Sequence, residues 1–90
     1  LLGLACREVG FDVVCAPVLD LRLPGQDAII GDRAFGSDPA EVARLGRAWV
    51  QGLQEAGCVP VVKHVPGHGR AAVDSHLELP VVTASRDELA

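Results

Sequence analysis

Two short apolar segments separated by a single amphipathic helix constrain the fold of this chain most strongly. Residues 11–18 (Phe-Asp-Val-Val-Cys-Ala-Pro-Val) and residues 58–64 (Cys-Val-Pro-Val-Val-Lys-His) are rich in β-branched side chains. Nearly continuous hydrophobicity over so few residues is typical of strands that are buried on both faces of a parallel sheet. Pro17 has no backbone N–H to donate, so we place it at the end of the first strand.

The helix between these segments is predicted over about residues 39–56. Asp38 suits the N-cap, Pro39 suits the first helical position, and Glu41 would complete a capping box. Gly57 is the residue type that commonly ends a helix. Apolar residues at helical spacing form one stripe, and we interpret Trp49 within it as core packing rather than as a ligand platform. The stripe consists of Val42, Leu45, Trp49, Val50 and Leu53.

Helix signals also stand near both ends of the chain. Residues 1–9 predict the end of a helix with Gly10 as its stop, and Ser85 with Glu88 forms a capping box that normally opens one. The order strand, loop, helix, strand, loop and helix start predicts an α/β fold with a parallel sheet, in about two and a half βα units. Because no helix follows the last cap and the chain has no Met, we expect residues 1–90 to be an internal fragment of a single larger domain.

Composition argues against several classes of function. Hydrophobic residues make up 49% of the chain, which is typical of a globular protein rather than a disordered one. A net charge of −4 without a basic run argues against nucleic-acid binding, and no apolar stretch approaches the roughly 20 residues that span a membrane. Cys6, Cys15 and Cys58 have no CxxC spacing and suit a reducing compartment, so we expect a cytoplasmic protein. The sequence carries no signal for its oligomeric state.

All the histidines of the chain lie between residues 64 and 76, starting at the end of the second predicted strand. Active sites of α/β folds lie at the carboxyl ends of strands, so this group of polar residues is the candidate site. Gly67 and Gly69 would let the backbone approach a ligand closely. Asp74 and His76 are two residues apart, which puts both side chains on one side of an extended backbone. A carboxylate on one ring nitrogen would fix the tautomer and leave the other nitrogen to exchange a proton, as general acid/base catalysis requires.

Each of these residues also has a simpler interpretation. Asp74 could be an ordinary turn residue, Lys63 a solvated charge, and His68 a loop cap. A metal site made by the histidines is weakly indicated, since their spacing lacks the i, i+4 pattern of helical zinc ligands. From the residues alone, the prediction is an α/β enzyme with a histidine on a loop.

A longer pattern resembles a known family. Residues 63–69 read Lys-His-Val-Pro-Gly-His-Gly, and residues 74–76 read Asp-Ser-His. Upstream, residues 16–20 read Ala-Pro-Val-Leu-Asp and residues 32–35 read Asp-Arg-Ala-Phe. In this order and spacing, the segments resemble the signature of bacterial family 3 glycoside hydrolases of the β-N-acetylhexosaminidase (β-N-acetylglucosaminidase) type.

The resemblance implies both a fold and a reaction. The fold would be a TIM-type (β/α)8 barrel, of which this chain supplies roughly the third and fourth strands with their loops. The reaction would be hydrolysis with retention, through a covalent glycosyl-enzyme intermediate. His76 would be the acid/base and Asp74 its partner, while Arg33, Lys63 and His64 would hold hydroxyl groups of the sugar. The nucleophilic aspartate would lie outside this chain, and no metal or other cofactor is expected.

The implied substrate is a carbohydrate, a GlcNAc-containing muropeptide, and the implied biology is the recycling of cell-wall fragments in the cytoplasm. Val65 stands where the family more often has Phe, and Ala34 where it more often has Ser; both are expected to be tolerated packing changes. Asp20 is expected to be structural, for instance by orienting Arg33. Two alternatives stay open: a family 3 β-glucosidase-like hydrolase, against which the loop-borne histidine speaks, and a non-catalytic binding module derived from the barrel.

Overall fold

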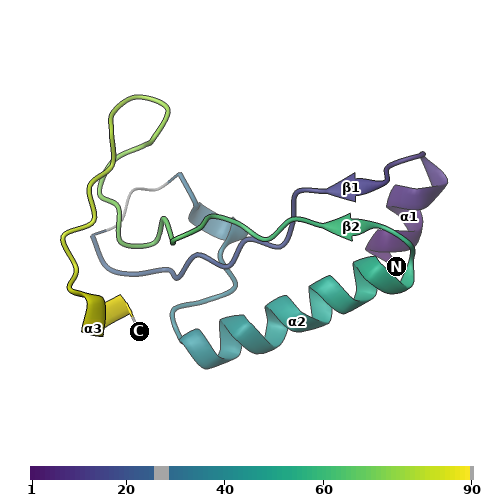
Figure 1. Cartoon of the computed structure of the whole chain (residues 1–90), viewed down its shortest axis with the longest axis horizontal. Helices are drawn as coiled ribbons and strands as arrows, with labels where there is room; N and C mark the ends of the chain where they lie inside the picture. The colour runs from purple at the N-terminus through teal and green to yellow at the C-terminus, as the bar shows by residue number, and fades with distance from the viewer. Residues whose placement is uncertain (26–28, 90) are drawn as a thin grey trace.

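The computed structural model describes residues 1–25 and 29–89. These residues form two strands, one long helix, two short helices and a 3₁₀ turn (Figure 1). In chain order the elements are α1 (Leu2–Glu8), β1 (Val13–Val14), η1 (Gly31–Arg33), α2 (Pro39–Glu55), β2 (Val59–Pro60) and α3 (Arg86–Leu89). Because α2 connects two strands that run in parallel, the predicted α/β class with a βαβ unit is confirmed.

The two strands pair over less of their length than the sequence predicts. β1 and β2 pair directly, and the pairing resumes only where Val18 lies opposite Lys63. The path from β1 to Val18 is one residue longer than the path from β2 to Lys63. In this path Ala16 donates its N–H to the carbonyl two residues earlier rather than across the pair (2.8 Å). An extra residue interrupts a ladder in this way at a β-bulge, so the prediction of continuous strands over 11–18 and 58–64 is wrong in extent.

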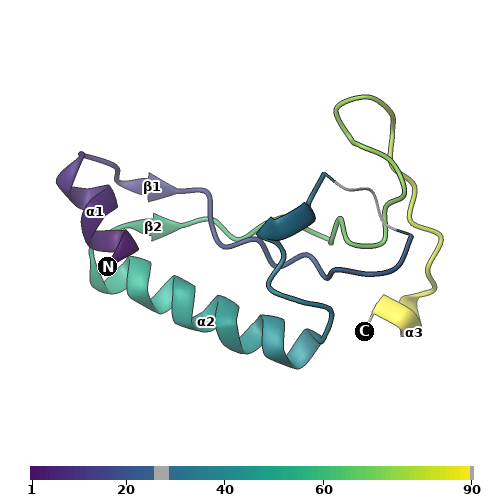
Figure 2. The same ribbon diagram turned by 180° about the vertical axis from the view of Figure 1, so that it is seen from behind.

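The strand pair is covered on one side by α2 (Figures 1 and 2). Leu53 of α2 and Cys58, just before β2, are almost fully buried. Val13 and Val59, by contrast, leave more than half of their surface exposed. The prediction that both faces of the strands are buried is therefore wrong for this chain, because the described residues cover only one of them.

α2 begins and ends close to the predicted residues. The carboxylate of Asp38 accepts a hydrogen bond from the backbone N–H of Glu41 (2.9 Å), and Gly57 follows the helix with a φ of +84°. The reciprocal bond of a capping box is replaced by another contact, since the carboxylate of Glu41 binds the guanidinium of Arg44 at 2.7 and 2.9 Å. This contact lowers the pKa of Glu41. The cap is thus confirmed on the side of Asp38 alone.

The apolar stripe of α2 is buried unevenly. Val42 and Leu53 are buried, but Trp49 is 38% exposed. The indole tilts against the ring of Phe35, with the ring centroids 6.0 Å apart and an interplanar angle of 47°. The interpretation of Trp49 as core packing is therefore wrong in this chain: its contact with Phe35 lies at the surface.

The short helices follow their predicted caps. Gly10, with a φ of +89°, comes shortly after the end of α1. Before α3, the carboxylate of Glu88 accepts hydrogen bonds from the N–H and the hydroxyl of Ser85 (2.8 Å each). The N–H of Glu88 donates to the hydroxyl oxygen of Ser85 at 3.3 Å, which completes the capping box. The predicted helix start is confirmed, although the helix runs for only about one turn in the described residues.

Candidate active site

The last paired residues of the two strands place two polar side chains next to each other. The N–H of Lys63 donates to the carbonyl of Pro17 (3.1 Å), and the N–H of Leu19 donates to the carbonyl of Lys63 (2.7 Å). Asp20 and His64 each follow directly after this last pairing. Parallel strands bring such residues together at their shared carboxyl edge, where α/β proteins place their sites.

Asp20 is the most buried polar residue of this edge. Its exposed fraction is 2%, and both carboxylate oxygens have partners. Oδ2 lies 2.5 Å from Nδ1 of His64, and Oδ1 accepts a hydrogen bond from the backbone N–H of His68 at 2.5 Å. The idea that Asp20 orients Arg33 is wrong, because its carboxylate is directed at these two histidines.

Arg33 makes its contacts within its own loop. Its guanidinium donates to the carbonyls of Ile29 (2.6 Å) and Ile30 (3.3 Å), and the residue ends η1. These bonds hold the side chain close to its own backbone. The structure therefore brings His64 and Asp20 together, and Lys63 directly precedes His64 in the chain. Arg33 has no hydrogen bond to these residues among the described contacts.

His68 joins this edge to the Gly-rich loop that follows. Its ring lies edge-on to the ring of His64, with centroids 6.0 Å apart. Its two ring nitrogens are buried, and neither has a hydrogen-bond partner among the described residues. The hydrogen bond that caps the loop is thus made by the backbone N–H of His68, which donates to Asp20, and not by its imidazole.

Asp74 and His76 form the second cluster. Oδ1 of Asp74 accepts a hydrogen bond from the N–H of His76 (2.8 Å) and lies 2.7 Å from Nδ1 of the same residue. The carbonyl of Asp74 accepts further bonds from the N–H groups of Leu77 and Glu78, each at 3.0 Å. The predicted side-chain contact is confirmed, but its basis is different: an Asx turn bends the chain so that the two side chains meet, and the backbone is not extended.

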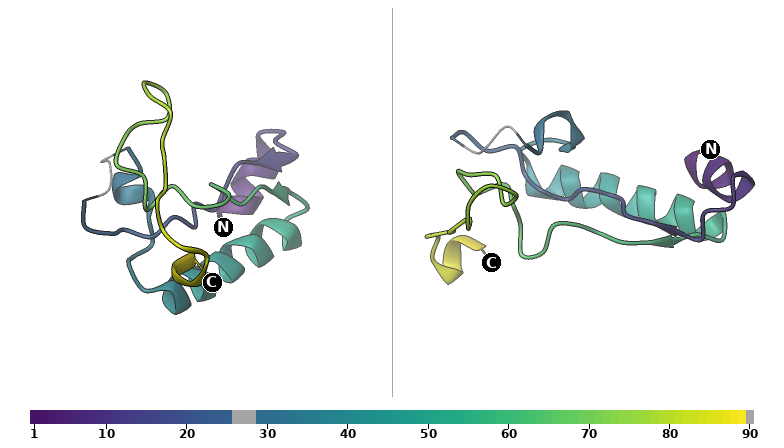
Figure 3. Two further views of the ribbon diagram at one scale, coloured as in Figure 1. Left: turned by 60° about the vertical axis from the view of Figure 1, so that its left-hand side comes forward. Right: turned by 90° about the horizontal axis from the view of Figure 1, so that it is seen from above.

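The pair is carried outward on its loop. The loop after β2 projects from the end of the molecule opposite α1 (Figures 1 and 3). The side chain of His76 is 78% exposed, whereas that of Asp74 is largely covered. The imidazole is therefore free to meet a ligand while the carboxylate holds it from behind.

The hydrogen bonds of the pair also set its charge. The backbone N–H of His76, then its imidazole, hold the pKa of the Asp74 carboxyl below its ordinary value, and the charges of His76 and His68 add to this. Asp74 consequently stays ionised in mild acid. An ionised carboxylate at Nδ1 keeps a proton on that nitrogen and leaves Nε2 to exchange one with a substrate.

A titration would test this description of Asp74. Its folded-state pKa is lowered, so its contribution to stability is present above the unfolded-state pKa and is lost as the pH falls through the folded-state pKa. We expect the carboxyl-carbon NMR shift of Asp74 to titrate below the range of ordinary aspartates. His76→Ala should raise the midpoint only in part, because alanine keeps the backbone N–H that contributes most. A variant midpoint fully back at the ordinary value would assign the shift to the imidazole instead.

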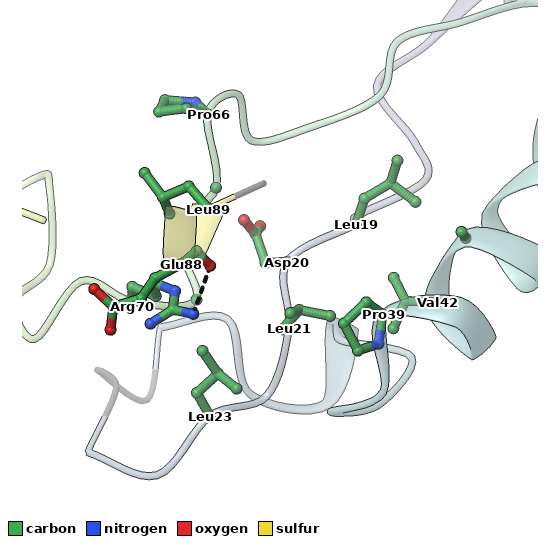
Figure 4. A pocket seen from close by; sticks show the side chains of 13 residues that line it. Leu19, Asp20, Leu21, Leu23, Pro39, Val42, Pro66, Arg70, Glu88 and Leu89 are labelled. Carbon is green, nitrogen blue, oxygen red and sulfur yellow. Dashed lines mark hydrogen bonds between the residues drawn. The ribbon is translucent and has the colours of Figure 1, made fainter. Parts of the chain in front are cut away.

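A cavity lies beside this site rather than in it. It has a volume of about 390 Å³ and is lined mainly by apolar side chains of residues 19–23, the start of α2, the Gly-rich loop and α3 (Figure 4). Arg70 crosses its edge and donates to the carbonyl of Glu88 at 3.1 Å. Asp20 lines this cavity, whereas His64, Asp74 and His76 do not. The cavity is therefore a neighbour of the candidate site.

Within residues 1–25 and 29–89, no group of three or more His, Cys, Asp or Glu side chains could hold a metal ion. No helix in the same residues has the length and apolar character needed to cross a membrane. 

The sequence motifs considered above do not predict that Asp20 links His64 to the backbone of His68. A signal for it was present: residues 16–20 and 58–64 both end in polar side chains after an apolar run. Two parallel strands that end in this way place those side chains at one edge. Applying this rule to both strands, rather than to the second alone, would have paired Asp20 with His64.

A parallel βαβ unit with paired acidic and histidine side chains beyond its strands is the arrangement in which α/β proteins place their sites. Residues 2–90 match the family described as the glycosyl hydrolase family 3 N terminal domain, and the chain belongs to this family. The resemblance found in the sequence is thereby confirmed.

Individual relatives agree with this assignment. The chain is 52% identical over 86 residues to the beta-hexosaminidase of Alkalilimnicola ehrlichii. The aligned residues make up 96% of this chain and 24% of the relative. It superposes with a TM-score of 0.92 and 43% identity on a glycoside hydrolase family 3 beta-N-acetylglucosaminidase from Paenibacillus sp., covering 98% of this chain and 17% of that one. NagZ from Neisseria gonorrhoeae in complex with N-trifluoroacetyl-D-glucosamine matches with a TM-score of 0.88 and 44% identity over 98% of this chain and 26% of that one. The chain spans about a fifth to a quarter of the length of the curated relatives it matches.

Proposed function

We propose that these residues belong to a longer retaining exo-β-N-acetylglucosaminidase in which His76 is the acid/base and Asp74 its partner. The observation that carries the proposal is the 2.7 Å contact between Asp74 Oδ1 and His76 Nδ1 on an outward-facing loop. It gains support from membership of a family whose relatives are called beta-hexosaminidases and beta-N-acetylglucosaminidases. In this proposal residues 1–90 are an internal segment of one catalytic TIM-type (β/α)8 barrel.

The chemistry follows from the geometry of the pair. In the first step, the imidazolium of His76 gives its Nε2 proton to the glycosidic oxygen as the bond to the aglycone breaks. The nucleophile, an aspartate that this chain does not supply, attacks the anomeric carbon and forms the glycosyl-enzyme intermediate. In the second step, the now neutral Nε2 takes a proton from water as that water attacks the anomeric carbon, which breaks the bond to the nucleophile and releases it as a carboxylate. Asp74 stabilises the charged imidazolium, which is present before the first step and forms again in the second.

The sugar would be held at the carboxyl edge of the strands. Lys63 and Arg33 carry donors but no acceptors, which suits them to the oxygens of sugar hydroxyls. The side chain of His64 is 38% exposed beside buried Asp20, so its ring can reach a ligand. For Arg33 to take part, its guanidinium would exchange the carbonyls of Ile29 and Ile30 for the sugar.

The proposal extends to the substrate and the place of action. We propose a terminal β-linked GlcNAc of a cell-wall muropeptide as the substrate and the cytoplasm as the compartment. Support for a reducing compartment comes from Cys6, Cys15 and Cys58, which are all free thiols. Support for a GlcNAc ligand comes from the complex of the Neisseria relative with N-trifluoroacetyl-D-glucosamine.

The deciding experiment is an assay of the complete reading frame that carries these residues. Release of an aryl alcohol is measured from the aryl β-GlcNAc glycoside and, in parallel, from the matching β-glucoside. We expect turnover of the GlcNAc substrate alone. Turnover of the glucoside would favour the β-glucosidase alternative, and binding of GlcNAc without turnover of either would favour the non-catalytic module.

A further inference from the structure

We infer that Asp20 is a positioning residue that couples sugar binding by His64 to the placement of the loop that carries Asp74 and His76. The inference rests on the proposed function and deepens it. One buried carboxylate would fix the tautomer of His64 through Oδ2 and anchor the loop through Oδ1. Asp20 would thus act on the reaction without touching the substrate.

The direction of each hydrogen bond follows from the groups involved. The backbone N–H of His68 can only donate, so Oδ1 of Asp20 accepts. A carboxylate is acceptor-only when ionised, and a buried one is stable as an anion when donors face both oxygens. Nδ1 of His64, 2.5 Å from Oδ2, is then the second donor. The proton of a neutral His64 therefore sits on Nδ1.

This tautomer defines what His64 offers to a ligand. With its proton on Nδ1, the neutral imidazole presents Nε2 as a hydrogen-bond acceptor. The ligand group that fits is a hydroxyl that donates to Nε2, whereas an ether oxygen or a missing hydroxyl leaves that nitrogen without a partner. On the proposed function, His64 would therefore recognise a free sugar hydroxyl that donates its proton to Nε2.

The loop is anchored at two consecutive residues. His68 is held by Oδ1 of Asp20, and Gly69 is buried against the backbone of Leu21, the residue after Asp20. A Cβ at Gly69 would overlap the carbonyl oxygen of Leu21 and come within 2.9 Å of its nitrogen. Asp74 follows five residues after this anchor. The segment around Asp20 therefore sets where the loop leaves the body of the fold.

The tautomer of His64 provides a test that does not depend on activity. In the complete protein we expect the ring-nitrogen NMR shifts of His64 to report a proton on Nδ1 and a bare Nε2, with the signals assigned by loss in His64→Asn. In Asp20→Asn the side-chain amide can donate to Nδ1, so the proton should move to Nε2. A wild-type spectrum with the proton on Nε2 would overturn the inference, even if Asp20→Asn failed to fold.

Ligand binding provides the second readout. The probe is N-trifluoroacetyl-D-glucosamine, followed by its fluorine NMR signal. We expect Asp20→Asn to weaken its affinity by about tenfold to 100-fold, because His64 would then turn a donor toward the ligand hydroxyl. His64→Asn keeps a group that can reach Asp20 but removes the outward nitrogen, and it should weaken binding similarly. Asp38→Asn is the matched control, since asparagine caps a helix as well as aspartate does, and it should bind like the wild type.

The outcomes separate the inference from the proposed function. Unchanged affinity in a folded Asp20→Asn protein would overturn the positioning role. A wild type that fails to hydrolyse GlcNAc glycosides but shows the Nδ1 tautomer and loses affinity in Asp20→Asn would refute the proposed reaction and leave the role of Asp20 standing.

Discussion

Replacing His76 by alanine is expected to slow the hydrolysis of GlcNAc glycosides with poor leaving groups by about 10²- to 10⁴-fold. The reason is that such an aglycone must be protonated as it departs. The side chain of His76 is exposed, and because Asp74 contacts its Nδ1, its Nε2 is available to supply that proton. An aryl glycoside with a good leaving group departs as a stable anion, so its first step should lose much less. The measurement is a series of pre-steady-state rates for leaving groups of decreasing acidity, for the wild type and His76→Ala.

Two further results make this test specific. Ser75→Ala changes the neighbouring exposed residue of the same turn and should leave the whole series unchanged. An added small nucleophile such as azide should speed the second step of His76→Ala, because it attacks the glycosyl-enzyme without needing a base. Equal slowing of good and poor leaving groups would contradict the role of His76 as the acid.

The helices could be predicted because their signals are local. Asp38 and Ser85 cap helices through partners only three residues away, and the structure contains both contacts. The extent of the strands could not be predicted in the same way. It depends on which residue pairs across the sheet, and the extra residue near Ala16 shifts that pairing after β1. The exposure of Val13 and Trp49 depends on what covers each surface, which the pattern of hydrophobic residues does not contain.

In the candidate site, too, contacts between residues close in sequence could be predicted, whereas contacts between distant residues could not. The contact between Asp74 and His76 spans two residues and could be predicted, although its Asx-turn geometry was not. Asp20 meets His64 and His68 across 44 and 48 residues of sequence, and only the parallel pairing of Val18 with Lys63 brings them together. The roles of Arg33, Lys63 and His64 in sugar binding remain predictions, since the contacts that define them would be made with a ligand.

Replacing Gly69 by alanine should reduce turnover by about 100-fold while the fold survives. The new Cβ would overlap the carbonyl oxygen of Leu21 and lie 3.1 Å from its carbonyl carbon, and these are backbone atoms that cannot swing away as a flexible side chain could. The loop must then move outward from the segment that follows β1. Displacements of about 1 Å in a reacting group can cost about 100-fold in rate. Overpacking of this kind also costs about 1–3 kcal/mol of stability, which leaves a folded but less stable protein.

Gly36→Ala is the control for this prediction. Gly36 also lies in a loop, but its backbone conformation is open to any residue and nothing lies within 4 Å of a Cβ placed there. It should therefore keep wild-type rates, and thermal melting of both variants would separate lost stability from lost activity. The rate series for leaving groups adds the decisive comparison: a displaced loop in Gly69→Ala should affect poor leaving groups most, in the same order as His76→Ala. If Gly69→Ala turned over like Gly36→Ala, close contact with Leu21 would not be needed to place His76, and the loop would take up its working position by some other contact.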